Sequence, residues 1–270
     1  MDFHPTTKPN LTTNDSAVLQ ALFDAESSPS NSITINPTLP AYPADLAISA
    51  DTLETLKSRE LTIIRTLQSP SLDLPTIHQA LHDLNTLITA HPIYPSAYAN
   101  RAQTLRLLID STPTSSSTEA NNNGNGDGDD KLFAPEHVDS ASRLLADLAK
   151  AIALATPRSP ADPVSEVQAR LLADVHTHRG YLLLKAARVR KESVGGGGGG
   201  GEEGGPDRLR GLGSDQLEDM ASRDFFFGGR YGNKVAQQLA VQTNPYAKMC
   251  GAIVKEALRK EVVGEEGVKI

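Results

Sequence analysis

His78 and His82 have the clearest metal-binding spacing in the sequence, because they lie four positions apart. On a helix this spacing places both imidazoles on one face, where they could hold zinc. A zinc site needs further protein ligands, and the sequence contains neither an HExxH motif nor paired cysteines to supply them. We therefore expect no metal site, and a His-based metal protein or enzyme is the minor alternative.

The single cysteine, Cys250, is the other side chain with reactive chemistry. It shares an apolar helical stripe with Tyr246 and Ile253, whereas the nearest cation, Lys248, faces another side of the helix. No cation is thus placed to stabilise the thiolate that a nucleophile requires, so we interpret Cys250 as structural. The glycine run 195–201 lacks the Lys-Ser/Thr ending of a phosphate-binding loop. The sequence predicts a protein that is not an enzyme and carries no cofactor.

The charge of the chain argues against nucleic acid and membrane partners. Lys and Arg number 26 against 33 Asp and Glu, which gives a formal net charge of -7 and no basic footprint for phosphates. The first 14 residues are polar, with no apolar segment of the kind that follows a basic start in a secretory signal. A lone cysteine is typical of a reducing compartment. We expect a cytoplasmic protein, with the nucleus not excluded.

Composition divides the chain into segments that can fold and segments that cannot. Residues 27–43 carry four prolines among Ser, Asn and Thr, residues 112–130 are a Ser/Thr block followed by NNNGNGDGDD, and residues 194–213 hold seven consecutive glycines. Such segments bury too little apolar area to offset their chain entropy. We predict a largely disordered region 1–48 with a short helix at about 15–23, disordered insertions 112–134 and 194–214, and a flexible tail 263–270.

Between these gaps the apolar residues recur with the helical period. Residues 51–68 and 75–90 predict two helices, residues 98–109 and 138–152 two more, and residues 164–182 a fifth. A shorter sixth helix occupies 217–225, and residues 235–239 and 246–257 form a closing segment. Phe226 to Gly229 disfavour a helix, so we expect the sixth helix to end early or fray. No segment alternates with period two, so the predicted fold class is all-α.

The spacing of small and large residues follows the tetratricopeptide repeat pattern in part. A small residue lets two antiparallel helices approach closely, and large apolar residues one turn away fill the groove between them. The predicted structural positions are Ala80, Leu84, Pro92, Tyr98, Ala102, Leu105, Ala141, Leu145, Gly180, Ala221 and Phe225. We predict a helical-hairpin solenoid over 49–262, with about three repeats at 51–92, 95–156 and 163–231 and closing helices at 233–262. A generic helical bundle is the alternative.

Three blocks of the chain resemble the tetratricopeptide repeat protein 36 family, in the order in which that family has them. They begin at Asn14, at Ser96 and at Ala221, and the last contains the signature residues Asn244, Pro245, Tyr246, Ala247 and Cys250. The resemblance spans roughly 14–258 outside the low-complexity gaps. It implies a tetratricopeptide repeat fold and a link to Hsp70 chaperones, to the stability of a tyrosine-catabolic dioxygenase and hence to tyrosine metabolism.

Stacked hairpins leave a concave face lined by the first helix of each pair, which suits an extended peptide or a partner helix. The residues expected to form this partner-binding groove are Lys57, Glu60, Ile64, Asn100, Gln103, Arg106, Thr177, Tyr181 and Lys185.

Such repeats can also hold a chaperone's C-terminal carboxylate in a clamp of Lys, Arg and Asn. Asn100 matches the clamp, whereas Glu60, Asp174 and His178 stand where the pattern has Lys, Lys and Arg. The two carboxylates would repel an acidic tail. The sequence therefore predicts a non-catalytic adaptor that binds protein partners, with Hsp70 or a metabolic enzyme client as the candidates. A structural subunit buried in a larger complex is the alternative.

Overall fold

The computed structural model describes residues 33–112, 128–195 and 205–244. Within these residues the chain forms α-helices joined by short 3-10 turns, with a single isolated bridge between Ile35 and Val164 and no strand. The prediction of an all-α fold is confirmed. The longest helix of the described residues is α6, with 30 residues, and it corresponds to the fifth predicted helix.

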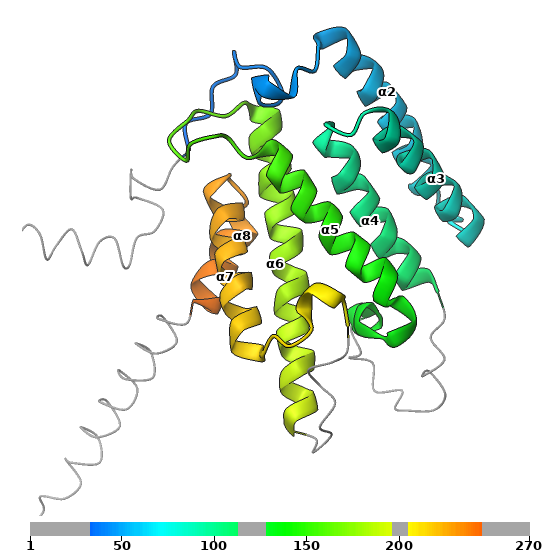
Figure 1. Cartoon of the computed structure of the whole chain (residues 1–270), viewed down its shortest axis with the longest axis vertical. Coiled ribbons are helices and arrows are strands. Elements are labelled where there is room, and N and C mark those ends of the chain that lie inside the picture. Colours follow the sequence, from blue (N-terminus) through cyan, green and yellow to red (C-terminus); the bar gives the residue numbers. More distant parts are fainter. Residues whose placement is uncertain (1–32, 113–127, 196–204, 245–270) are drawn as a thin grey trace, which may run out of the picture.

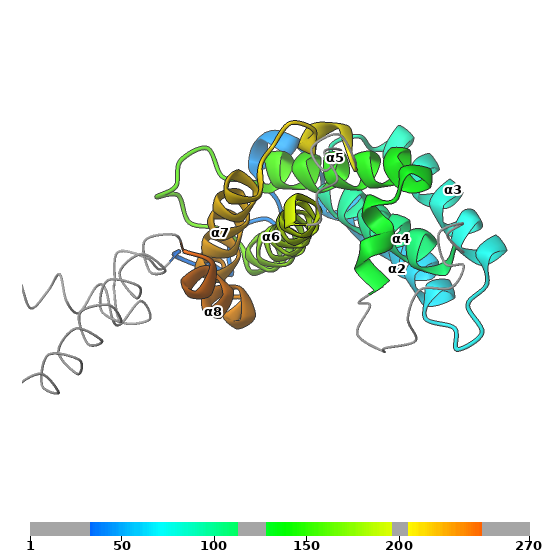
Figure 2. The same cartoon turned by 90° about the horizontal axis from the view of Figure 1, so that it is seen from below.

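Seven α-helices follow one another in the described residues, and the chain reverses direction at each connection (Figure 1). Their bounds are α2 Ala50–Leu67, α3 Leu74–Ala90, α4 Pro95–Ser111, α5 Val138–Ala155, α6 Glu166–Gly195, α7 Ser214–Arg230 and α8 Lys234–Thr243. Neighbours in sequence pack on one another, so α2–α3, α4–α5 and α6–α7 form three helical hairpins and α8 covers α7. The helices make a curved row in which α4 and α6 lie on the inner side of α5 (Figure 2).

Polar side chains begin several of these helices, because the first N–H groups of a helix need an acceptor. Ser49 accepts from the amide of Thr52 at 3.2 Å to start α2, and Asp73 accepts from the amide of Thr76 at 2.9 Å to start α3. Hydrogen bonds from the Thr76 hydroxyl and amide lower the pKa of Asp73. Asn233 starts α8 in the same way through Ala236. Asp, Ser and Asn thus set the helix boundaries that apolar periodicity alone leaves approximate.

The region expected to be disordered before residue 49 begins to pack earlier than composition predicts. Asn36 and Val164 share a backbone hydrogen bond of 2.8 Å, and the Ser165 hydroxyl donates to the Ala41 carbonyl at 2.8 Å. Tyr42 is buried and meets the ring of Tyr94 edge-on at 5.8 Å. One aromatic residue supplies the apolar area that the surrounding Pro, Ser and Asn lack, so residues 33–48 belong to the folded part.

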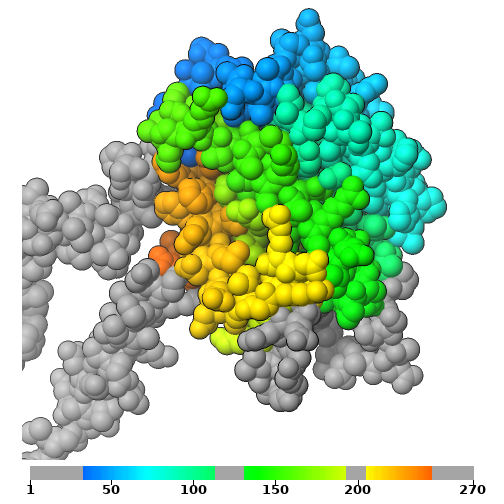
Figure 3. Space-filling view, viewed as in Figure 1, coloured from blue at the N-terminus to red at the C-terminus, as the bar shows by residue number. Residues whose placement is uncertain are grey.

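Parts of both segments predicted to be disordered insertions are folded. In the first, the 3-10 turn η4 Gly128–Phe133 buries Leu132, and η5 Pro135–His137 leads into α5. In the second, α6 extends to Gly195 and η6 Asp207–Leu209 buries Leu209. Figure 3 shows this second segment, in yellow, lying across α5 and α7, where the Asp207 amide donates to the Ser142 hydroxyl at 3.1 Å. In each segment one leucine, Leu132 or Leu209, is buried in the core, and the short 3-10 turn that contains it is folded.

The expectation that the sixth helix ends early is wrong. Helix α7 continues through Phe226, Phe227, Gly228 and Gly229 to Arg230. A Cβ on Gly228 would lie 2.7 Å from the Thr177 hydroxyl of α6, and one on Gly229 would lie 2.7 Å from Gln237 of α8. The glycines allow three helices to approach closely, and this packing outweighs their low helix propensity.

No helix in the described ranges combines the length and the apolar composition needed to cross a bilayer, the 30-residue α6 included.

Candidate functional site

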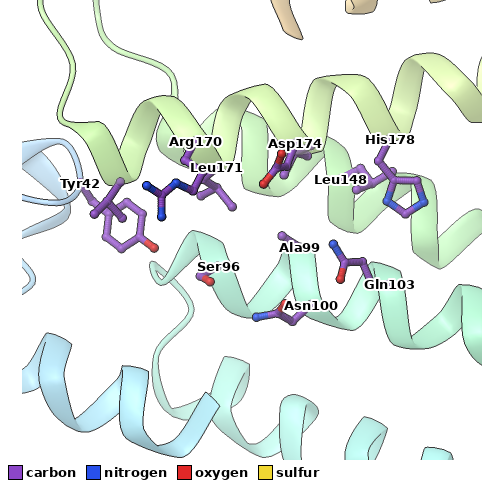
Figure 4. A pocket seen from close by; sticks show the side chains of 12 residues that line it. Tyr42, Ser96, Ala99, Asn100, Gln103, Leu148, Arg170, Leu171, Asp174 and His178 are labelled. Carbon is purple, nitrogen blue, oxygen red and sulfur yellow. The ribbon is translucent and has the colours of Figure 1, made fainter. Parts of the chain in front are cut away.

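A cavity of about 230 Å³ opens between α4 and α6. These two helices lie on the inner side of the curved row (Figure 2). Its α4 wall consists of Ser96, Ala99, Asn100 and Gln103, and its α6 wall of Val167, Arg170, Leu171, Asp174, Val175 and His178. Leu148 of α5 forms the floor and Tyr42 closes one end (Figure 4). The cavity therefore lies between the first helices of two neighbouring hairpins, which is where a concave binding face was expected.

Helix α6 presents three polar side chains to the cavity at four-residue intervals, namely Arg170, Asp174 and His178. Figure 4 shows all three directed from α6 towards α4. Arg170 forms an ion pair of 2.8 Å with Glu166 one turn earlier on the same helix. Burial raises the pKa of Asp174, and the charge of Arg170 partly offsets that rise. The wall thus carries both signs of charge on an otherwise apolar surface.

Behind the α4 wall a buried carboxylate, Glu60 of α2, holds two groups in place. The Tyr94 hydroxyl donates to one of its oxygens at 2.7 Å, and the Asn100 amide donates to the other. Burial raises the pKa of Tyr42 to about 12, and the charge of Glu60 adds to this effect. The same two causes raise the pKa of Tyr94. Both phenols therefore keep their protons at neutral pH, and the Asn100 side chain is oriented by Glu60.

Of the residues predicted to form the groove, Asn100 and Gln103 line the cavity. Arg106, Tyr181 and Lys185 come together immediately beyond it. The Arg106 guanidinium lies 5.4 Å and the Lys185 ammonium 5.5 Å from the centre of the Tyr181 ring, and both contacts are of the cation–π type. The structure therefore places five predicted residues, Asn100, Gln103, Arg106, Tyr181 and Lys185, along the α4–α6 face.

The other predicted groove residues lie elsewhere. Thr177 faces α7, because its hydroxyl occupies the space beside Gly228, so its placement in the groove is wrong. Glu60 is only 8% exposed and supports the α4 wall from behind instead of presenting its charge on the face. Lys57 forms an ion pair of 2.9 Å with Glu54 on α2, and neither it nor the half-buried Ile64 lines the cavity. The face of α2 is therefore not continuous with the cavity.

The predicted repeat positions are mostly buried at helix contacts. Ala80, Leu84, Tyr98, Ala102, Leu105, Ala141, Leu145, Ala221 and Phe225 are all buried. At Gly180 a Cβ would lie 3.0 Å from the Phe225 ring, so a side chain there would press on that ring. Pro92 is exposed, and its carbonyl accepts from the Tyr98 hydroxyl at 3.0 Å. Of the signature residues, Asn244 ends α8, whereas Pro245, Tyr246, Ala247 and Cys250 lie outside the described residues.

The histidines have different environments. His78 and His82 are exposed on α3, and the described ranges contain no group of three or more His, Cys, Asp or Glu side chains that could hold a metal ion. His178 lines the cavity. His176 is buried and pairs with Asp224 of α7 at 2.8 Å.

Comparison with known proteins identifies a close relative. The chain is 64% identical over 257 residues to the L-tyrosine degradation gene cluster protein hmgX of Aspergillus fumigatus, and the match covers 95% of each chain. The chain belongs to the hmgX family. No family model and no solved structure matches it. The hmgX match names no tetratricopeptide repeat family, so that resemblance stays a prediction.

Sequence reasoning missed Tyr42 and Arg170 as parts of the site in this hmgX family member. Tyr42 lies in a Pro-rich stretch, and its being the one large aromatic residue there is the signal that could have been used. Arg170 begins the polar series 170, 174 and 178, whose four-residue spacing marks one face of a helix. Neither signal says which other helix that face meets, because this depends on how the hairpins stack.

Proposed function

We propose that this chain is a non-catalytic adaptor of the tetratricopeptide repeat type that binds a protein partner and acts in the degradation of L-tyrosine. The observation that carries the proposal is the 64% identity, over 95% of both chains, to a protein whose name places it in an L-tyrosine degradation gene cluster. At this identity over nearly the whole length, two chains share one fold. A role in the same process is therefore the simplest expectation.

The arrangement of helices supports the repeat assignment. Hairpins α2–α3, α4–α5 and α6–α7 pack in sequence order, and each contact is made at small buried residues such as Ala80, Ala102 and Gly180. This is the packing by which helical hairpins build a curved stack with one concave face. The cavity between α4 and α6 lies on that side and offers a surface for a partner.

The geometry of the cavity supports a binding role over a catalytic one. Acyl transfer by a serine would need a hydroxyl within hydrogen-bond reach of a histidine. Figure 4 shows Ser96 beside Tyr42 at one end and His178 beside Gln103 at the other. The cavity therefore separates its hydroxyl from its imidazole, whereas its polar groups alternate with apolar ones, as on a recognition surface.

We propose that the partner is an enzyme of tyrosine breakdown or an Hsp70 chaperone that acts on such an enzyme, in line with the family resemblance. The test is deletion of the gene in the organism that encodes it, followed by growth with tyrosine as the carbon source. We expect the deletion strain to fail on tyrosine and to grow normally on glucose. Normal growth on tyrosine would remove the tyrosine assignment.

Complementation and capture test the adaptor role. The deletion strain should recover with the wild-type chain and with Asp215→Ala, an exposed change on α7 away from the cavity, and it should recover less with Ala99→Arg, which fills the cavity. Tagged wild-type chain from tyrosine-grown cells should enrich a tyrosine-catabolic enzyme or Hsp70, and the Ala99→Arg chain should not. Full recovery with a correctly folded Ala99→Arg chain would show that the cavity is not the partner site.

The alternative of a structural subunit draws support from the outer helices. Phe226, Val235 and Val241 are 45%, 59% and 58% exposed on α7 and α8. Large apolar side chains exposed to this extent can mark a surface that another chain covers. Size-exclusion chromatography with light scattering on the native extract separates the two roles, because a permanent subunit elutes only with its complex, whereas an adaptor also elutes as a free chain.

A further inference from the structure

The charges around the α4–α6 cavity are unequal. Three carboxylates surround it, namely Asp174 on its wall, Glu60 behind Asn100 and Glu166 beside Arg170. Arg170 is the single guanidinium on the wall, and its ion pair with Glu166 already balances it. The local charge of the described residues is therefore negative.

The two carboxylates other than Glu166, those of Glu60 and Asp174, form no ion pair with a described cation. The two hydrogen bonds to Glu60 come from a phenol and an amide, which are neutral donors. Asp174 accepts no hydrogen bond from a described residue, although Arg170 lies near enough to influence its ionisation. Glu60 accepts one of the two Asn100 amide N–H groups, and the Asn100 oxygen can accept a hydrogen bond from a ligand. Both features favour a ligand that donates hydrogen bonds and carries positive charge.

The size of the cavity indicates what part of a ligand it holds. Pockets for whole small molecules measure roughly 300–1,000 Å³. At about 230 Å³ this cavity is smaller, and it lies on an open face between two helices. It therefore suits one side chain of a larger partner better than a complete metabolite. Ala99, Leu148 and Leu171 supply apolar walls for a methylene stem, and long cationic side chains bury such stems while their heads seek polar groups.

We propose that this cavity receives a lysine or arginine side chain from an extended segment of the partner protein, with the cationic head between Asp174 and the Asn100 oxygen. This inference rests on the proposed adaptor function and names the chemistry of its partner. Arg106 and Lys185, stacked on Tyr181, bound the acidic part of the face beyond Gln103 and His178.

The test is binding of the full-length chain to arrayed heptapeptides with randomised flanks and a fixed central residue, which is Lys, Arg, Gln or Glu. We expect the Lys and Arg pools to bind at least tenfold more strongly than the Glu pool, with the Gln pool between them. The preference should weaken as salt is raised, because exposed charges are screened. Equal binding of the four pools, or a preference for Glu, would overturn the proposal.

Charge reversal at Asp174 identifies the residue responsible. Asp174 is exposed enough to be replaced without unfolding the chain, and Asp174→Lys should abolish the preference for Lys and Arg or turn it towards Glu. Asp215→Lys on α7 makes the same change in net charge away from the cavity and should leave the preference intact. An equal loss in the two variants would contradict a local site. Circular dichroism spectra confirm that both variants keep their helices.

Competition with free arginine amide distinguishes a peptide segment from a small cation. We expect the amide to compete only at concentrations at least a hundredfold above those of the best peptide, and equal potency would contradict the proposal. The outcomes are independent of the test of function. A preference for basic pools in a chain that tyrosine growth does not require would remove only the pathway assignment. A required chain without that preference would remove only this inference.

Discussion

An arginine–aspartate pair joins the two helices of hairpin α4–α5, and a second such pair joins those of hairpin α6–α7, but the surroundings of the two pairs differ. In each, an arginine just before a small residue of the first helix reaches an aspartate of the second helix with two hydrogen bonds. Arg101 binds Asp147 at 2.7 and 2.6 Å, and Arg179 binds Asp224 at 2.7 and 2.7 Å. Bidentate pairs of this kind are directional as well as strong. Each pair therefore sets the register of its hairpin.

The two pairs differ in what surrounds them. The side chains of Arg101 and Asp147 are 10% and 5% exposed, and Asn85 of α3 accepts a further hydrogen bond from Arg101. The side chain of Arg179 is 27% exposed, and Asp224 shares its oxygens with the imidazole of His176. His176 lies beside Phe227, with ring centres 5.3 Å apart. Hairpin α4–α5 thus relies on an ion pair that is almost completely shielded from water. Hairpin α6–α7 relies on a partly hydrated pair that also contacts the imidazole of His176.

Asp147→Ala should produce the largest loss of stability. It leaves the Arg101 guanidinium buried without its carboxylate, and removing one partner of a buried pair costs about 3–5 kcal/mol. Urea unfolding followed by circular dichroism measures this loss. Asp139→Ala, an exposed change on the same helix, is the control and should cost less than about 0.5 kcal/mol. A cost below about 1 kcal/mol for Asp147→Ala would show that Arg101 finds water or another acceptor.

Asp224→Asn should cost less, about 1.5–3 kcal/mol, which is the range for hydrogen bonds to charged groups. The asparagine keeps one acceptor for His176 or Arg179, and the partly exposed Arg179 can turn towards water. The same urea experiment applies. If Asp224→Asn proved as costly as Asp147→Ala, the difference in burial between the hairpins would have no energetic consequence.

Gly180→Ala tests the small residue at the contact between α6 and α7. A Cβ at this position would lie 3.0 Å from the Phe225 ring and 3.2 Å from the Ala221 carbonyl oxygen. Overpacking costs about 1–3 kcal/mol, which the better helix propensity of alanine offsets by about 0.5–1 kcal/mol. We expect a net loss of about 1 kcal/mol in thermal unfolding. Gly213→Ala, where no atom lies within 4 Å of the added Cβ, is the control. A stabilised Gly180→Ala variant would show that the contact relaxes without cost.

The smallest effect concerns pH. Burial alone would raise the pKa of Asp224, but hydrogen bonds from His176 and Arg179, together with their charges, outweigh burial and hold it below its usual value of 3.8. The stability that this lowered pKa contributes is present above that value and is lost as the pH falls below it. The wild-type chain should therefore lose its advantage over Asp224→Asn below about pH 4. A constant difference between about pH 6 and pH 3 would contradict this assignment.

The sequence predicted most of the helices because each buries a stripe that recurs every three or four residues. It failed where one residue changes the outcome, as at Tyr42, Leu132 and Leu209, each of which brings a low-complexity segment into the core. It also failed at Gly228, where low propensity suggested a helix end and close packing keeps the helix intact. The composition of a segment is an average over all its residues, so it does not reveal one buried side chain among many polar ones.

For the site, Asn100 and Gln103 were predicted because they lie on the face of α4 opposite its packing stripe. Thr177 was misplaced because it lies only one residue from His178, and one helical residue rotates a side chain by about 100°. Helical periodicity, small residues and charge were therefore determined by the sequence alone. The tertiary structure alone decided which helices meet around the cavity and that Glu60 supports its wall from behind. These contacts join residues far apart in the sequence, such as Glu60 and Asn100 at a separation of 40 positions, and depend on how whole hairpins stack.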